Sequence, residues 1–132
     1  MVFQLLYESR AITPRGQIED LDILREALER NAQLGVTGYL VRSPSHFAQL
    51  LEGEEGVVWE LYAQIRRDKR HSDVKTLMTQ NGPNRQFPDW SMGYAEIAMD
   101  PNESVSPQQW LRIIKTAAQD LGGGSPLSAP DP

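Results

Sequence analysis

The sequence contains no cysteine, so disulfides, thiolate nucleophiles and zinc or iron–sulfur sites built from cysteine are excluded. Only two histidines are present, His46 and His71, which is too few to predict a histidine-rich metal site. Acidic residues outnumber basic ones by 18 to 13, and the net charge of −5 disfavours a nucleic-acid-binding face, because such a face needs positive charge. We therefore expect no metal site built from cysteine or histidine and no nucleic-acid partner, while a magnesium or calcium site built from carboxylates stays open.

Long apolar segments are also missing. No run approaches the roughly 18 consecutive apolar residues that a membrane helix needs. Glu8 and Arg10 interrupt the apolar start of the chain before it could form a secretory leader. We therefore expect no contact with a membrane and a cytoplasmic location.

The 132 residues, 39% of them hydrophobic, are typical of one folded domain. Apolar periodicity predicts strands over 2–9, 36–42, 46–52, 74–79 and 92–97, and helices over 17–34, over 54–68 and from Ser106 onward. Gly35 stands where it can end the first helix, and Ser106 with Gln109 forms a capping box. We divide the chain into a core over residues 1–98, a helical cap over 99–121 and a disordered tail over 122–132.

This order of elements predicts a ferredoxin-like βαββαβ sandwich, an α+β fold, with an extra strand and a C-terminal helix. The expected sheet is mixed and five-stranded. We expect the first and third strands to be parallel neighbours at its centre, with the first two helices on one face. The C-terminal helix carries an apolar stripe that contains Trp110, Ile113 and Ala117. This helix either covers the opposite sheet face permanently, or lies behind Gln49 and the strand around Met92 and shifts with that strand to transmit a signal.

Three polar side chains stand at positions that the apolar pattern turns inward. Tyr7 continues the face of Phe3 and Leu5, Gln49 lies between two apolar residues of its strand, and Asn31 extends the stripe of the first helix. A buried polar group without a partner costs about 1 to 3 kcal/mol, so each needs a hydrogen bond. Two arrangements satisfy this need: the side chains bond to the backbone, or they hold a planar ligand with a polar edge between the helices.

Several motifs, in order and in spacing, resemble the BLUF domain, a blue-light sensor that holds a flavin without a covalent bond. They lie between residues 2 and 97: Tyr7 with Ser9-Arg10, Asn31 before Gly35-Val36-Thr37-Gly38, Phe47-Ala48-Gln49-Leu50-Leu51-Glu52-Gly53, Asp68 with Arg70-His71, and Arg85-Gln86-Phe87 with Trp90-Ser91-Met92. Each motif alone is weak, but five in register are specific.

The resemblance implies roles around the flavin. Tyr7 is implied as donor of an electron and a proton to the excited flavin, and Gln49 as the amide that bridges Tyr7 to flavin N5 and O4. Asn31 would hold the O4/N3 edge, and Arg30 would reach O2. The remaining implied residues are Ile23 and Ile65 around the ring, Asp68, Arg70 and His71 near the rim and ribityl chain, and the pair Trp90 and Met92, whose packing would report the state of Gln49. Which of these two lies next to Gln49 stays open.

Some of these residues would also have a place in a chain that binds no flavin. Ile23 and Ile65 would be core residues in any case, whereas Arg30, Asp68 and Arg70 could form a solvated ion cluster. Alternation along the strands places Ala48 and Glu8 on the face opposite Gln49 and Tyr7, where they should not disturb the photochemistry.

The resemblance implies a photoreceptor rather than an enzyme, with FAD as cofactor and FMN or riboflavin as alternatives. Its red-shifted signalling state would pass to a separate effector protein or within a homo-oligomer, because no effector domain follows in the sequence. A small ferredoxin-like enzyme is disfavoured, since the inward polar residues form no nucleophile, base or metal set. A flavin-free interaction module of the same fold is the remaining alternative.

Overall fold

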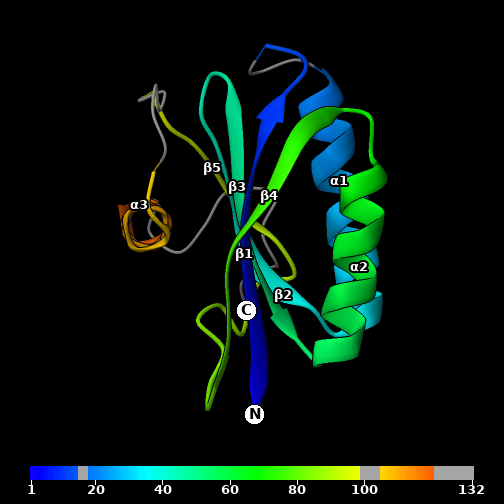
Figure 1. Cartoon of the computed structure of the whole chain (residues 1–132), viewed down its shortest axis with the longest axis vertical. Helices are drawn as coiled ribbons and strands as arrows, with labels where there is room; N and C mark the ends of the chain where they lie inside the picture. The colour runs from blue at the N-terminus through cyan, green and yellow to red at the C-terminus, as the bar shows by residue number, and fades with distance from the viewer. Residues whose placement is uncertain (15–17, 99–104, 121–132) are drawn as a thin grey trace.

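The structure is a computed structural model that describes residues 1–14, 18–98 and 105–120. Its elements are β1 (Val2–Ala11), α1 (Ile18–Leu34), β2 (Thr37–Arg42), β3 (His46–Gly53), α2 (Glu55–Arg67), β4 (His71–Gly82), β5 (Gly93–Glu96) and α3 (Pro107–Asp120). Figure 1 shows α1 and α2 together on one face of the sheet and α3 on the other. The predicted α+β sandwich is confirmed, while the expected disordered tail over 122–132 lies outside the described residues.

The five strands form one sheet in the order β4-β1-β3-β2-β5, which is mixed because only β2 and β5 pair in parallel. β1 and β3 are central neighbours as predicted, but the prediction that they are parallel is wrong: they run antiparallel. The connections explain this direction. α1 leads from β1 to β2, which lies two positions away in the sheet. The tight turn at 43–45 then returns the chain as β3, which fills the position between β1 and β2 and runs antiparallel to both.

Two apolar cores lie on the two faces of the sheet. One core joins α1 and α2 to β1 and β3 through residues such as Leu24, Leu61 and Leu51, and the other joins α3 to the opposite face. Leu6 breaks the expected alternation of β1 because it belongs to the second core. Helices cover both faces of the sheet, so the strands carry apolar side chains toward each face.

β4 extends over His71–Gly82, beyond the predicted 74–79, because it pairs with nearly all of β1. It is an edge strand, and many of its residues are half-buried or exposed. Polar residues such as Gln80 and Asn81 therefore occupy strand positions without an apolar pattern.

Gly35 ends α1 as predicted, with a φ of +68°, in the left-handed region that glycine adopts without strain.

α3 begins with the predicted capping box: the Ser106 backbone N–H donates to Gln109 Oε1 at 2.8 Å, and the Gln109 N–H donates to Ser106 Oγ at 3.1 Å. Trp110 and Ile114 are fully buried against the sheet. Trp110 Nε1 also donates to Glu8 at 2.9 Å, and Ala48 lies in the same core, so both residues face away from Tyr7 and Gln49 as predicted. None of the helices in the described ranges is long and apolar enough to cross a membrane.

Candidate functional site

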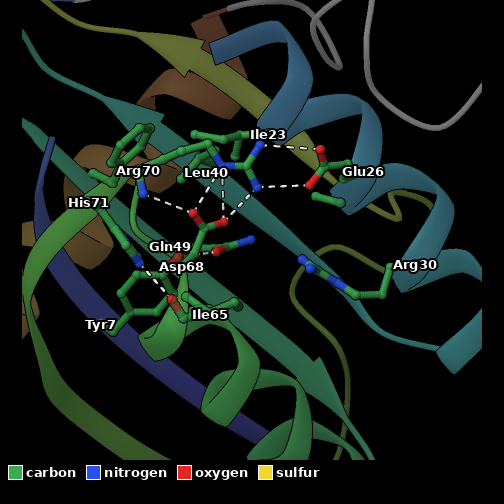
Figure 2. Close-up of a pocket in the computed structure, with 12 residues that line it drawn as sticks. Tyr7, Ile23, Glu26, Arg30, Leu40, Gln49, Ile65, Asp68, Arg70 and His71 are labelled. Atoms are coloured by element: carbon green, nitrogen blue, oxygen red, sulfur yellow. Dashed lines mark hydrogen bonds and ion pairs between the residues drawn. The ribbon is translucent and has the colours of Figure 1, made fainter. Parts of the chain in front are cut away.

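A cleft that is partly open to solvent lies between α1 and α2 above the centre of the sheet (Figure 2). Its lining is formed by Tyr7, Ile23, Glu26, Ala27, Arg30, Leu40, Phe47, Gln49, Ile65, Asp68, Arg70 and His71. The structure thus brings together most of the residues proposed from the sequence. The other three, Asn31, Trp90 and Met92, lie outside this lining.

The floor of the cleft carries Tyr7 and Gln49, which are direct partners across β1 and β3. The Tyr7 hydroxyl donates to Gln49 Oε1 at 2.5 Å, and both side chains are 4% exposed. Burial raises the pKa of the Tyr7 hydroxyl well above its usual value, with Tyr62 as a further cause, so Tyr7 keeps its proton at neutral pH. A protonated phenol therefore faces an amide oxygen that can accept its proton.

The other end of the Gln49 amide contacts Met92, because Nε2 lies 3.2 Å from the Met92 sulfur. The sequence leaves open whether Trp90 or Met92 lies next to Gln49, and the structure places the Met92 sulfur there. Trp90 packs instead with Tyr39 and Phe87 in the core below α3, with ring centroids 5.3 and 5.8 Å away.

The last turns of α1 place Arg30 and Asn31 near the end of the cleft. Asn31 is fully buried; its Nδ2 donates to the backbone oxygen of Ser91 at 3.0 Å, but its Oδ1 has no hydrogen-bond partner among the described residues. Arg30 Nε also has none within the described ranges, and burial lowers the pKa of its guanidinium. The site thus contains a buried acceptor, Asn31 Oδ1, and a buried donor, Arg30 Nε, that form no hydrogen bond with the described residues.

This pair fits the imide edge of a flavin ring, where an N–H lies between two carbonyl groups. Oδ1 of Asn31 would accept from the N–H, and Nε of Arg30 would donate to a carbonyl. Ile23 on α1 and Ile65 on α2 supply apolar walls for the ring (Figure 2). The polar atoms and apolar walls of the site therefore fit a flavin ring.

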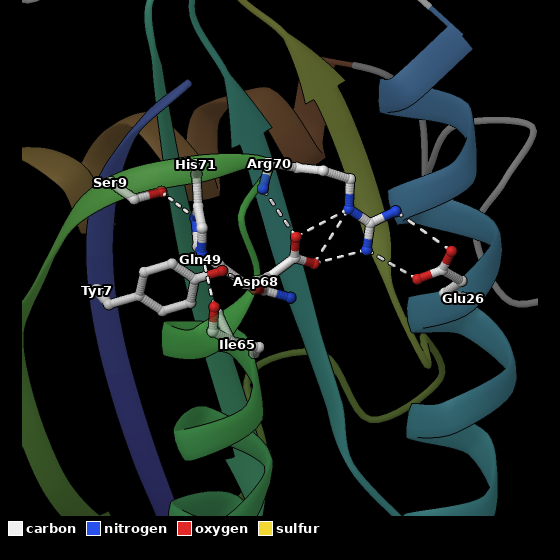
Figure 3. A network of polar contacts seen from close by, with 8 residues as sticks. All are labelled: Tyr7, Ser9, Glu26, Gln49, Ile65, Asp68, Arg70 and His71. Atoms are coloured by element: carbon white, nitrogen blue, oxygen red, sulfur yellow. Dashed lines mark hydrogen bonds and ion pairs between the residues drawn. The ribbon is translucent and has the colours of Figure 1, made fainter. Parts of the chain in front are cut away.

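An ion network crosses the mouth of the cleft from α1 to the end of α2 (Figure 3). Arg70 Nη2 lies 2.6 Å from Asp68 Oδ2 and 2.8 Å from Glu26 Oε1. The hydrogen bonds from Arg70 lower the pKa of both carboxyls, so the network stabilises the fold at neutral pH and is lost as acidification protonates them. Asp68 and Arg70 thus form an ion cluster, with Glu26 as a member that the sequence did not indicate.

His71 is fixed edge-on to the ring of Tyr7, with centroids 6.4 Å apart. Its Nε2 lies 2.7 Å from the backbone oxygen of Ile65, and its Nδ1 lies 2.7 Å from Ser9 Oγ (Figure 3). A carbonyl only accepts, so Nε2 carries the proton. His71 therefore ties β4 to β1 and α2 beside the photoactive candidates.

Arg42 supports the cleft from within the protein, and sequence reasoning missed it. Its side chain is fully buried, forms a salt bridge to Asp20 at 3.3 Å, and lies over the ring of Phe47 at 4.7 Å. It also donates to the backbone oxygens of Thr13 and Ser43. The available signal was a charged residue at the end of an apolar strand, and because charged residues are common at strand ends, it did not indicate a buried Arg42.

Comparison with known proteins identifies similar chains. Residues 2–93 match the sequence profile of the BLUF family, described as sensors of blue light using FAD. Over 96 residues the chain is 38% identical to the photoactivated adenylate cyclase subunit beta of Euglena longa, an alignment that covers 72% of this chain. It spans only 11% of that relative's own length.

Solved structures show the same fold. The ground state of BlsA is 27% identical and superposes with a TM-score of 0.81, over 96% of this chain and 93% of its own. BlrP1 of Klebsiella pneumoniae with FMN and cyclic diGMP is 26% identical with a TM-score of 0.68, over 98% of this chain and 31% of that one.

Proposed function

This chain belongs to the BLUF family and is a blue-light sensor that uses FAD; within it, we propose that Tyr7 and Gln49 are the photoactive pair. The observation that carries the proposal is a pair of buried hydrogen bonds, one from the Tyr7 hydroxyl to Gln49 Oε1 and one from Gln49 Nε2 to the Met92 sulfur. Bound FAD supplies a chromophore that becomes an oxidant when it absorbs blue light.

In this proposal, Tyr7 would give an electron to the excited flavin and its proton along the hydrogen bond to Gln49, and both would return to Tyr7 once the amide has rearranged. An amide has one donor end and one acceptor end, so rotation of Gln49 would turn Nε2 toward Tyr7 and Oε1 toward Met92. The photoreceptor's signal is then a rearranged hydrogen bond, which is read as a red shift of the flavin band and reverses in the dark.

Gln49→Leu tests the proposal. We expect this variant to bind FAD and to show no red shift under blue light, because leucine fills the space without a donor or an acceptor. The measurement is the absorption difference between light and dark, and Gln64→Leu, at an exposed position of α2, is the matched control. A normal red shift in Gln49→Leu would remove the amide from the mechanism.

Asn31 and Arg30 are proposed to hold the imide edge of the flavin, with Ile23 and Ile65 on the two sides of the ring and Asp68, Arg70 and His71 at the rim. The two buried polar atoms without partners in the described structure support this assignment. FAD is the cofactor of the family, and FMN and riboflavin carry the same ring.

Asn31→Ala is expected to weaken FAD binding about 5- to 150-fold, because the loss of a buried hydrogen bond is worth about 1 to 3 kcal/mol. Titration of the flavin-free chain with FAD, followed by fluorescence, measures the change. Asn84→Ala, at an exposed loop position, is the control. Equal affinities would leave Asn31 as a purely structural residue that holds Ser91.

For output, we propose that residues 1–98 form the sensor, that 99–121 form a helical cap, and that the signal passes to a separate effector in the cytoplasm or within a homo-oligomer. The sensor itself is proposed to catalyse no reaction. Glu8 supports a route through α3, since it follows Tyr7 in β1 and accepts a hydrogen bond from Trp110.

Hydrogen exchange over residues 107–120 tests this route. We expect lower protection under blue light than in the dark, because a shift of β1 would strain the bond between Glu8 and Trp110. In Gln49→Leu the difference should disappear. Identical protection of the unsubstituted chain in both conditions would make α3 a static cover.

A further inference from the structure

Glu52 is a fully buried carboxyl group that has no part in the proposed flavin site. It lies near the end of β3, opposite Gln4 of β1 and Thr37 of β2. The alternation of β3 turns it away from the cleft, because Gln49 and Leu51 face the helices α1 and α2. A buried carboxyl needs several hydrogen bonds, so its partners indicate what it holds.

Four donors converge on the Glu52 carboxyl group. Two come from side chains of the sheet, Gln4 Nε2 at 2.7 Å and Thr37 Oγ1 at 3.1 Å. The other two are backbone N–H groups of the loop between β4 and β5, Gln86 at 2.5 Å and Phe87 at 3.0 Å. Glu52 therefore fastens this loop to the centre of the sheet.

The same loop leads directly to the residue beside Gln49. The Phe87 backbone oxygen accepts from the Trp90 N–H at 3.3 Å, and their rings stack with planes 8° apart. The Trp90 oxygen then accepts from the Gly38 N–H at 3.1 Å. Two residues after Trp90, the Met92 sulfur reaches Gln49 Nε2. The position of this sulfur thus depends on a loop that is held by Glu52.

We propose that Glu52 is a positioning residue of the photocycle: it anchors the β4–β5 loop so that the Met92 sulfur keeps Gln49 oriented with Oε1 toward Tyr7. The chemistry follows from the two ends of the amide. A thioether sulfur accepts a hydrogen bond from Nε2 but has no proton to offer Oε1, so it favours the present orientation. This inference rests on the proposed role of Gln49.

Glu52→Gln tests the anchor, because glutamine keeps the shape but presents an NH₂ group where an acceptor oxygen stood. The Gln86 and Phe87 N–H groups bond to different oxygens of Glu52, so in the flavin-free chain we expect at least one of these two amides to exchange about tenfold faster, as for one lost hydrogen bond. We also expect a changed methyl NMR shift of Met92. Glu55→Gln removes a neighbouring exposed carboxyl and is the matched control, with no change expected.

With FAD bound, Glu52→Gln should show a dark flavin band already moved toward the red and a smaller change on illumination, because both orientations of Gln49 are then populated in the dark. Met92→Leu should give the same spectra without faster exchange at Gln86 and Phe87. Combined with Met92→Leu, Glu52→Gln should add nothing further to the spectra, since both act through one sulfur.

Unchanged exchange at Gln86 and Phe87 would overturn the proposal, and so would normal spectra in a chain whose loop exchanges faster. Additive spectral effects in the double variant would do the same. If Glu52→Gln does not fold, Thr37→Val weakens the same anchor, and the same changes are expected at smaller size. Failure of the Gln49 role is separate, because it appears as a red shift that persists in Gln49→Leu.

Discussion

Tyr7→Phe is expected to bind FAD and to lose the light-induced red shift completely. The ring contacts of Tyr7 with Tyr62 and His71 are available to phenylalanine, so the cleft keeps its shape. The hydroxyl that donates to Gln49 is removed, and with it the proton whose retention at neutral pH follows from the raised pKa of Tyr7. The variant should therefore be yellow but insensitive to light.

Tyr62→Phe is the matched control for this experiment. Tyr62 is also buried, its ring centroid lies 5.3 Å from that of Tyr7, and its hydroxyl bonds to Thr76 rather than to Gln49. Absorption spectra before and after blue illumination should show a red shift in Tyr62→Phe and none in Tyr7→Phe. If Tyr7→Phe cycles normally, another residue must supply the proton to Gln49.

Arg42→Met is expected to lower the free energy of unfolding by about 3 to 5 kcal/mol, because it breaks the buried salt bridge between Arg42 and Asp20 by removing one member of the pair. It also removes the donor to the backbone oxygens of Thr13 and Ser43 and the cation above Phe47. A loss of this size is a large part of the roughly 5 to 15 kcal/mol that stabilises a domain.

Urea unfolding of the unsubstituted chain and of Arg42→Met measures this loss, provided that the free energy of unfolding falls with urea concentration at the same slope in both. Arg10→Met is the control, since Arg10 and Asp73 form an exposed pair 3.7 Å apart, and such pairs contribute about 0 to 1 kcal/mol. Adding Asp20→Leu to Arg42→Met should recover part of the stability, because the buried carboxylate that lost Arg42 is then gone as well. A loss below about 1 kcal/mol in Arg42→Met would contradict the role of this pair.

Much of the fold could be predicted from local patterns. The helices α1 and α2 follow from apolar residues three and four apart, and their ends follow from Gly35 and from the acidic start of α2, where Glu54 accepts from the Gly56 N–H. β4 was predicted too short, because an edge strand needs no continuous apolar face. The direction of β3 relative to β1 was wrong, because periodicity within a strand carries no information about its neighbour.

The sequence by itself determined that Tyr7, Asn31 and Gln49 are buried, since polar residues stood on apolar faces, and its motifs indicated the family. Only the tertiary structure decided which partners they meet. Met92 rather than Trp90 lies beside Gln49, Arg42 pairs with Asp20, and Glu52 holds the amides of a loop more than 30 residues away along the chain. Local patterns report which face a residue takes, whereas a hydrogen bond or a salt bridge between distant segments exists only after the chain has brought them within about 3 Å.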